Sequence, residues 1–338
     1  MSARTIALVA ALTLAAPLVI GAQQTGAQQA AIQQTATPQA PTPQAPTPQA
    51  PTPQERAERM TTAFLAWAEA AGVEGAEIAV ARNGDRVLSR AAEGVPGAPR
   101  VLGSLGKSVT AQCVAGLVEA RRLRWDTTLG QVLGWSGPGA EITVAGLITQ
   151  SSGLRDDRTQ EAMPLWFDGQ GNWHAVARWG VVPGEPGFRY NNENYAILGS
   201  VIEAVTGQTY AVACDGVLPQ ARLAPPVEPF APMGGWQASL GDYAVFQSLL
   251  WGNRPPEGPV AELGGDVVYG LGMYGRPRGD AWIWWHLGAI CMPGRLEATA
   301  YSLVMLDGWT VAVAMDGCPD YDQLSTLDRT LWQAFGNE

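Results

Sequence analysis

Ser104 and Lys107 are the residues of this sequence whose types and spacing most directly indicate chemistry. They lie three positions apart in V-L-G-S-L-G-K-S-V-T-A (101–111), where we predict the first turn of a helix. Residues at i and i+3 share one helix face, so the hydroxyl and the amine can touch. Lys107 is the only lysine among the 21 lysine and arginine residues. Because a desolvated lysine can lose its proton and an arginine cannot, we predict that Lys107 activates Ser104 as a nucleophile.

Two other interpretations of this segment stay open when it is taken alone. Ser104 can be an ordinary N-terminal helix residue and Lys107 a solvated side chain. Alternatively, Leu102–Gly106 comes close to a G-x-S-x-G nucleophile elbow, for which His286 could complete a Ser–Asp–His triad. The elbow's first glycine is missing, however, and that motif gives no reason for the single lysine.

Periodic apolar residues and turn signals predict strands at both ends of the chain and helices between them. Helices are predicted over 55–71, from Ser104 to about Ala120 and over 323–335, and Asn83-Gly84 predicts a β-hairpin. Strands are predicted at the following positions: 77–82, 86–92, 267–274, 281–288, 297–306 and 310–315.

The expected fold is α+β, with one antiparallel sheet built from both chain ends (about 55–115 and 255–338) and flanked by the terminal helices. A mostly helical subdomain (about 116–254) is inserted, and we expect a cleft where the two parts meet. Within that subdomain, the pattern of Arg155–Arg158 predicts a solvated turn.

The N-terminal part of the chain predicts export. Residues 1–22 combine a short basic start, an apolar stretch and small residues, which is typical of a secretory signal peptide, with an uncleaved membrane anchor as the alternative. Residues 23–54 end in three copies of A-P-T-P-Q and predict a disordered, extended linker. The folded domain is expected over 55–338, in the periplasm or secreted.

Charge and cysteine usage narrow the possible partners. The formal charge of −10 argues against nucleic acid and against an anionic membrane surface. We expect a monomer that binds a small-molecule or peptide substrate and meets a membrane only through an uncleaved signal. With two histidines and no C-x-x-C, no metal site is expected. Cys291 and Cys318 could pair in an oxidising compartment, whereas Cys113 reads as a plain core residue, and Cys214 is left unassigned.

Three further stretches accompany the serine and lysine segment. They are I-T-V-A-G-L-I-T-Q-S-S-G-L (142–154), P-G-E-P-G-F-R-Y-N-N-E-N-Y-A-I-L-G (183–199) and W-W-H-L-G (284–288). With these four stretches in this order, about residues 60–335 resemble the serine β-lactamase and penicillin-binding-protein superfamily. Within it the chain is most similar to the branch of class C β-lactamases, DD-peptidases and related esterases.

The resemblance implies roles for the first two motifs of that family. The S-x-x-K motif matches Ser104 as the acylating nucleophile and Lys107 as the neutral amine that helps to deprotonate it. Tyr190-Asn191-Asn192 fits the family's Tyr-x-Asn motif. It implies Tyr190 as general base or proton relay, with a pKa lowered by nearby cations, and Asn192 as a hydrogen-bond partner of Lys107 and substrate. An aromatic residue packed beside two turn asparagines is the alternative.

The third motif departs from the family pattern. His286-Leu287-Gly288 stands where the family usually has Lys-Thr-Gly or Lys-Ser-Gly, and histidine occurs there in esterase and peptidase relatives. The resemblance implies that Gly288 lets the strand approach the substrate, and that the backbone N–H groups of Ser104 and Ala289 form the oxyanion hole. A strand histidine satisfied by core hydrogen bonds is the alternative for His286.

The expected function is an exported serine hydrolase that works through a Ser104 acyl-enzyme without metal or organic cofactor. A neutral imidazole lacks the fixed positive charge that helps to hold a substrate carboxylate, and Leu287 lacks the usual hydroxyl. We therefore expect ester or amide substrates without that anion to be preferred over β-lactams. The alternative is a penicillin-recognising sensor module that becomes acylated without efficient turnover.

Overall fold

The computed structural model describes residues 50–182, 184–185, 187–252 and 254–336. The predicted signal peptide and nearly all of the predicted linker lie outside the described residues. Helix α1 begins at Pro53, two residues before the predicted start of the domain, and Thr52 caps it. Within the described ranges, no helix has both the length and the apolar character needed to cross a membrane.

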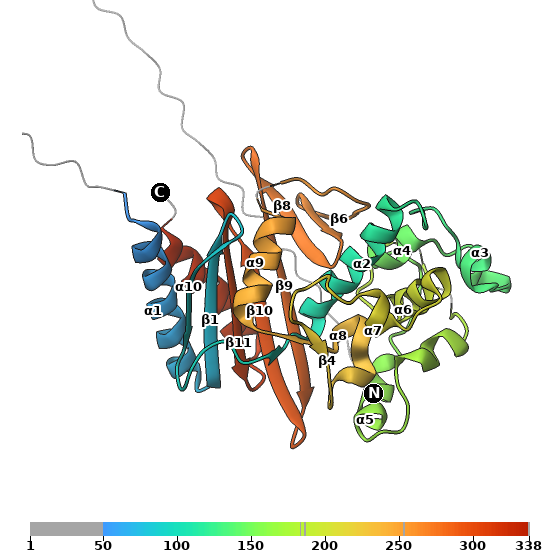
Figure 1. Ribbon diagram of the computed structural model, residues 1–338, viewed down its shortest axis with the longest axis horizontal. Coiled ribbons are helices and arrows are strands. Elements are labelled where there is room, and N and C mark those ends of the chain that lie inside the picture. The colour runs from blue at the N-terminus through green and yellow to red at the C-terminus, as the bar shows by residue number, and fades with distance from the viewer. Residues whose placement is uncertain (1–49, 183, 186, 253, 337–338) are drawn as a thin grey trace, which may run out of the picture. The chain divides into compact units, whose positions relative to one another are not determined.

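An eight-stranded antiparallel sheet with the order β2-β1-β11-β10-β9-β8-β7-β6 joins the two ends of the chain (Figure 1). This arrangement confirms the predicted α+β fold. The strands are β1 Glu74–Arg82, β2 Asp85–Ala91, β6 Ala261–Gly264, β7 Val267–Gly270, β8 Met273–Arg278, β9 Ala281–Met292, β10 Leu296–Val304 and β11 Trp309–Asp316.

Helices fill most of the chain between β2 and β6 and also cover the sheet. Short strands missed from the sequence, β3 Arg100–Val101, β4 Arg222–Leu223 and β5 Trp236–Ala238, form a second small sheet. The helices are α1 Pro53–Ala71, α2 Lys107–Glu119, α3 Leu129–Leu133, α4 Val144–Ile148, α5 Thr159–Phe167, α6 Asn192–Thr206, α7 Tyr210–Ala213, α8 Ala231–Gly234, α9 Leu240–Leu250 and α10 Tyr321–Phe335.

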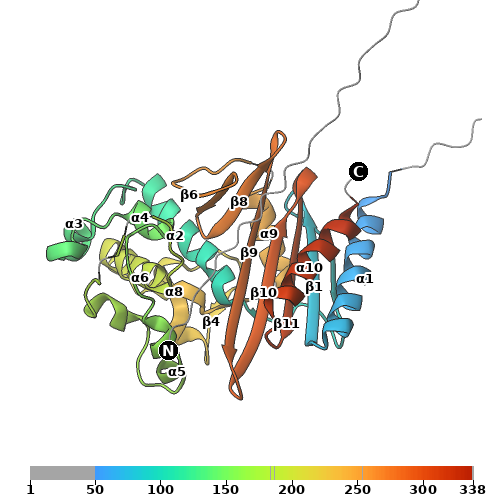
Figure 2. The ribbon, with the colours of Figure 1, turned by 180° about the vertical axis from the view of Figure 1, so that it is seen from behind.

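Two hydrophobic cores lie on opposite faces of the large sheet. Helices α1 and α10 lie side by side over one face (Figure 2), where Phe64 and Leu331 are fully buried. The other face carries α9 and the helical part of the chain. Successive residues of a strand point to opposite faces. Accordingly Trp284 of β9 belongs to the core on the helical side, whereas Trp285 packs against the core beneath α1 and α10.

Two tight turns decide whether the predicted strands agree with those of the structure. Asn83 and Gly84 both have positive φ and connect β1 to β2, as the Asn-Gly hairpin signal predicts. The single strand predicted over 267–274 is wrong. Leu271 and Gly272 take positive φ there, and the chain reverses between β7 and β8.

All four cysteines are paired in disulfides. Cys291 at the end of β9 bonds Cys318, a pairing that the sequence left open. Cys113 of α2 bonds Cys214, so the interpretation of Cys113 as a plain core residue is wrong. The apolar face of α2 brings Cys113 against the segment after α7, with 5.4 Å between the two Cα atoms. Because 101 residues separate the two, this bond ties helix α2 to a distant part of the helical region.

Candidate active site

Ser104 lies in a 3-10 turn, Gly103–Gly106, which leads directly into helix α2. The preceding residue, Gly103, has φ +52°, a conformation that residues with a side chain rarely adopt. A Cβ at Gly103 would also lie 2.8 Å from the backbone nitrogen of Ala289 on β9. Glycine therefore lets this turn press against the strand, which brings Ser104 to the edge of β9.

Lys107 begins α2 and is completely buried beneath Ser104. Its Nζ lies 2.9 Å from Ser104 Oγ, 2.7 Å from Asn192 Oδ1 and 2.7 Å from the carbonyl oxygen of Met233. The two carbonyl oxygens can only accept hydrogen bonds. A neutral amine has two N–H donors and one lone pair, so it satisfies both acceptors and keeps the lone pair for the Ser104 hydroxyl.

Burial lowers the pKa of Lys107 to about 7, partly opposed by the negative charge of Asp157. The charged form of a lysine is strongly disfavoured where it leaves water, unless a carboxylate pairs with it. Among the described residues, no carboxylate lies within ion-pair distance of Lys107. A large fraction of Lys107 is therefore neutral near pH 7, as a base for Ser104 must be.

Tyr190 lies beside Lys107, with its ring centre 5.0 Å from Nζ. The tyrosine hydroxyl is buried and meets no hydrogen-bond partner among the described residues. Burial and the neighbouring Tyr269 raise the pKa of Tyr190 well above its ordinary value, while Ser104 lowers it. The expectation that cations depress this pKa is wrong. A phenol that keeps its proton can donate or relay one, but it is not a resting base.

Asn192 is the first residue of α6, and its side-chain oxygen accepts the hydrogen bond from Lys107. The helix begins there because Asn191 has an extended backbone and its side chain accepts a hydrogen bond from the backbone N–H of Glu193. Asn192 also lines the cleft. The oxygen of its amide is engaged with Lys107, and within the described residues its Nδ2 has no protein acceptor, which leaves that group for a substrate carbonyl.

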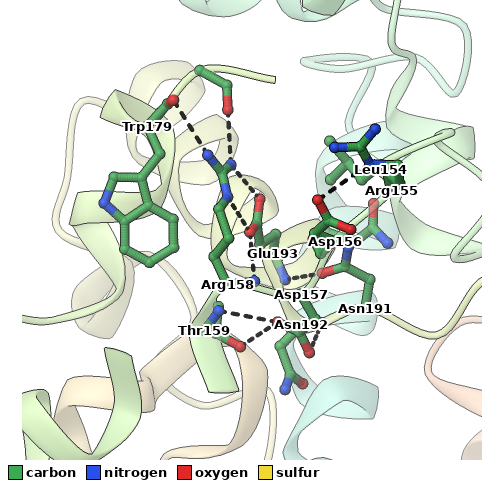
Figure 3. Close-up of polar contacts among 12 residues, drawn as sticks. Leu154, Arg155, Asp156, Asp157, Arg158, Thr159, Trp179, Asn191, Asn192 and Glu193 are labelled. Carbon is green, nitrogen blue, oxygen red and sulfur yellow. Dashed lines mark hydrogen bonds and ion pairs between the residues drawn. The ribbon is translucent and has the colours of Figure 1, made fainter. Parts of the chain in front are cut away.

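The segment before α5 is bonded to the residues at the start of α6 (Figure 3). Arg158 and the buried Glu193 form an ion pair at 2.7 Å, and Asn191 Nδ2 donates to the backbone oxygen of Asp156 at 2.8 Å. The Asp157 carboxylate accepts a hydrogen bond from the backbone N–H of Asn192 at 3.2 Å. The solvated turn predicted for Arg155–Arg158 is therefore wrong for Asp157 and Arg158. Sequence reasoning missed both, because their partners lie 35 residues away.

Gly288 and Ala289 bring β9 against the turn that carries Ser104. A Cβ at Gly288 would lie 2.0 Å from Leu102 O and 2.9 Å from Ser104 N, so only glycine fits. The Ser104 and Ala289 backbones meet at this contact, and both residues line the cleft. The oxyanion hole formed by these two backbone N–H groups stays a prediction, and the close approach of the turn to β9 is compatible with it.

His286 lies on β9 behind Tyr190, 2% exposed, and is not among the residues that line the cleft. Its Nδ1 lies 2.7 Å from the carbonyl oxygen of Leu287, which makes Nδ1 the protonated nitrogen. Burial and the nearby Lys107 lower the pKa of His286 to about 3. The imidazole is thus neutral and packs among tyrosines rather than facing a bound substrate.

A cleft of about 390 Å³ opens beside Ser104, between α5 and the end of β9. None of the described residues that line it carries a formal charge. Its apolar wall includes Met163, Phe230, Met233, Ile290 and Met292. The polar groups are concentrated around Ser104, Tyr190 and Asn192. The cleft therefore suits an uncharged, largely apolar group next to a reactive carbonyl.

Comparisons with known proteins point to one family. A sequence model of the Beta-lactamase family matches residues 57–218, which include Ser104, Lys107, Tyr190 and Asn192. Penicillin-binding protein 4 of Amycolatopsis lactamdurans is 32% identical over 120 residues, covering 32% of this chain and 30% of that protein. The chain thus matches less than a third of the length of this curated relative.

Solved structures share the fold across most of the chain. A D-stereospecific amidohydrolase from Streptomyces sp. is 20% identical, with a TM-score of 0.62 over 79% of this chain and 97% of that one. A β-lactamase/D-alanine carboxypeptidase from Pseudomonas syringae is 13% identical, with a TM-score of 0.64 over 82% and 98%. The family match spans the serine, lysine and tyrosine motifs, and the solved structures share the fold. The chain is therefore similar in sequence and in fold to proteins of the serine β-lactamase and penicillin-binding-protein superfamily.

Proposed function

We propose that this protein is an exported serine hydrolase that forms an acyl-enzyme at Ser104 and prefers uncharged esters or amides to β-lactams. The observation that carries the proposal is the buried Lys107 amine, which lies 2.9 Å from Ser104 Oγ with its two other partners limited to accepting hydrogen bonds. That environment supports a neutral amine whose lone pair faces the serine hydroxyl.

The proposed acylation moves one proton and exchanges one bond. Ser104 Oγ attacks the substrate carbonyl carbon while Lys107 Nζ takes the hydroxyl proton, and the oxyanion lies against the backbone N–H groups of Ser104 and Ala289. The bond to the leaving group then breaks as Tyr190 gives its proton to the leaving oxygen or nitrogen and regains one from Lys107. Water hydrolyses the acyl-enzyme by the reverse proton path.

The substrate preference rests on charge and on the cleft wall. The cleft lining contains no charged side chain among the described residues, and His286 is neutral and buried behind Tyr190. A free carboxylate next to the reactive carbonyl would therefore lose water without gaining a cation. The similar structures include a D-amino acid amidase from Ochrobactrum anthropi complexed with L-phenylalanine amide. Amides of apolar amino acids are thus a reasonable amide class to test beside simple esters.

Export is part of the proposal and rests on two features. The signal-like residues 1–22 precede a proline-rich linker. The two disulfides, Cys113–Cys214 and Cys291–Cys318, are bonds that persist in oxidising compartments such as the periplasm.

The test combines turnover with mass detection of the adduct. Purified protein is incubated separately with p-nitrophenyl butyrate and with the cephalosporin nitrocefin, and product formation and intact mass are followed together. We expect ester turnover well above nitrocefin turnover and no adduct in the Ser104→Ala control. A stable adduct without turnover would support the sensor alternative, whereas fast nitrocefin hydrolysis with negligible ester cleavage would overturn the preference.

A further inference from the structure

The Asp157 carboxylate accepts hydrogen bonds from residues around the start of α6. Figure 3 shows Asp157 together with two of these donors, Thr159 and Asn192. One carboxylate oxygen accepts hydrogen bonds from the backbone N–H and the hydroxyl of Thr159. The other accepts from the side-chain amide of Gln160 at 3.1 Å and from the backbone N–H of Asn192 at 3.2 Å. Within the described residues, no arginine or lysine lies at ion-pair distance. The carboxylate is thus held by four hydrogen bonds from neutral donors.

These bonds connect Asp157 to the catalytic lysine through a single residue. Asn192 receives its backbone anchor from Asp157 and gives its side-chain oxygen to Lys107 Nζ at 2.7 Å. The backbone N–H of Asn192 belongs to the first turn of α6, where helix N–H groups lack partners inside the helix and a negative charge is favourable. The carboxylate therefore fixes the end of the helix that carries the Asn192 side chain.

We propose that Asp157 is a positioning residue of the reaction, which fixes Asn192 and, through it, the Lys107 amine that faces Ser104. This inference rests on the proposed function, since it assigns Asp157 a place in the same acylation step. Asp157 does not touch the substrate, because it is not among the residues that line the cleft.

The charge of Asp157 has a second consequence for Lys107. The titratable groups facing the amine are Tyr190 and Tyr195 at 5.0 and 5.6 Å from their ring centres, His286 on β9, and Asp157. Burial keeps both tyrosines and the histidine neutral, since it raises the tyrosine pKa values and lowers that of His286. Asp157 is the carboxylate of this set, and it raises the pKa of Lys107 against the effect of burial.

The neighbouring Asp156 provides a matched control. Its side chain is exposed and pairs with Arg155, also exposed, so Asp156→Asn removes the same charge one residue away without touching Asn192. Asp157→Asn removes the charge and turns an amide N–H toward groups that also donate. Asp157→Ala removes all four hydrogen bonds, and a displacement of about 1 Å in a catalytic group costs about a hundredfold in rate.

The experiment measures kcat and kcat/KM for p-nitrophenyl butyrate from pH 5 to 9 in the three variants and the wild type. We expect Asp157→Ala to lower kcat about tenfold to a hundredfold. For Asp157→Asn we expect the acidic limb of the profile to move to lower pH, because the group that raised the pKa of Lys107 is gone. Asp156→Asn should keep both the plateau and the limb. Unchanged kcat in Asp157→Ala together with an unmoved limb in Asp157→Asn would overturn the inference.

A second readout does not depend on activity and separates this inference from the proposed function. The free energy of unfolding is measured at several pH values for four proteins: the wild type, Lys107→Met, Asp157→Asn and the double variant. In each background, the protein that keeps Lys107 is compared with the one that carries methionine there. The difference between the two chains titrates with Lys107, and we expect its midpoint to lie at lower pH in the Asp157→Asn background. The same midpoint in both backgrounds counts against Asp157 even when the enzyme is active. A shifted midpoint in a protein without turnover counts against the proposed function only.

Discussion

Replacement of Lys107 gives the sharpest test of the proposed chemistry. Burial lowers its pKa from 10.5 to about 7. At pH 7 about half of the amine is therefore neutral, whereas a lysine with the unperturbed pKa would be neutral in about one molecule in three thousand. The environment thus supplies about a thousandfold more of the free base at pH 7.

Two variants separate the proton chemistry from the charge. Lys107→Arg keeps a cation that cannot be deprotonated, and Lys107→Met keeps an unbranched chain of similar length without a basic group. We expect kcat/KM of the wild type for p-nitrophenyl butyrate to rise through one ionisation near pH 7 and then level off. Both variants should lose about three orders of magnitude or more at the plateau and show no such ionisation. Circular dichroism melting checks that each variant folds.

The same substitution has a stability signature whose sign follows from linkage. The folded state holds Lys107 with a pKa of about 7, below the unfolded value of 10.5, so between these pH values the unfolded chain binds more protons. Stability contributed through Lys107 therefore rises with pH, by about 1.4 kcal/mol per pH unit. Urea unfolding should show the wild type gaining about 1 kcal/mol over Lys107→Met from pH 7 to 8 and about 1.3 kcal/mol from pH 8 to 9, because the full slope is reached only above the folded pKa. A pH-independent difference, or an Arg variant within tenfold of the wild-type rate, would refute the neutral-lysine mechanism.

Two further substitutions test the contact behind the oxyanion hole and the far end of the cleft. Gly288→Ala would place a Cβ 2.0 Å from Leu102 O, so we expect about a hundredfold lower kcat and a lower melting temperature. Gly116→Ala is the control, because a Cβ there meets nothing within 4 Å. It should leave kcat and the melting temperature unchanged. Arg295 donates to Pro164 O at 2.9 Å and ties the β9–β10 turn to α5 across the cleft, so Arg295→Ala should raise the kcat/KM of p-nitrophenyl octanoate relative to the butyrate. An unchanged chain-length preference would show that this bridge does not limit the acyl group.

Local sequence patterns predicted the elements and contacts that depend on residues close together in the sequence. The i and i+3 spacing of Ser104 and Lys107 predicts their proximity, and the structure places their side chains 2.9 Å apart. The Asn83-Gly84 turn and the helix over 55–71 could also be predicted from short segments. Turn conformation and apolar periodicity depend only on residues within such a segment. Tyr190 and Asn192 could be placed beside Lys107 only through the resemblance to a family, since 83 or more positions separate them from it in the sequence.

Contacts between distant segments were the ones that sequence reasoning missed. Asp157 looked like part of a solvated turn because its partner Asn192 lies 35 residues further on. Cys113 and Cys214 are 101 residues apart, and an apolar helix face predicts a buried thiol equally well as a disulfide. The break at Leu271-Gly272 was hidden because both flanking strands are apolar and read as one continuous run.

The hydrogen-bond acceptors around position 107 explain why this position carries the only lysine of the chain and not an arginine. The site offers Asn192 Oδ1 and Met233 O as obligate acceptors and one hydroxyl, that of Ser104. A guanidinium brings five N–H donors, no lone pair and a permanent charge, so it would leave donors unsatisfied and a charge buried. An ammonium satisfies the two carbonyls but presents its third hydrogen to the serine, which then cannot give up its own proton to that nitrogen. The neutral amine fits all three partners, and the fold accepts the cost of burying Lys107 because only that form can accept the proton of Ser104.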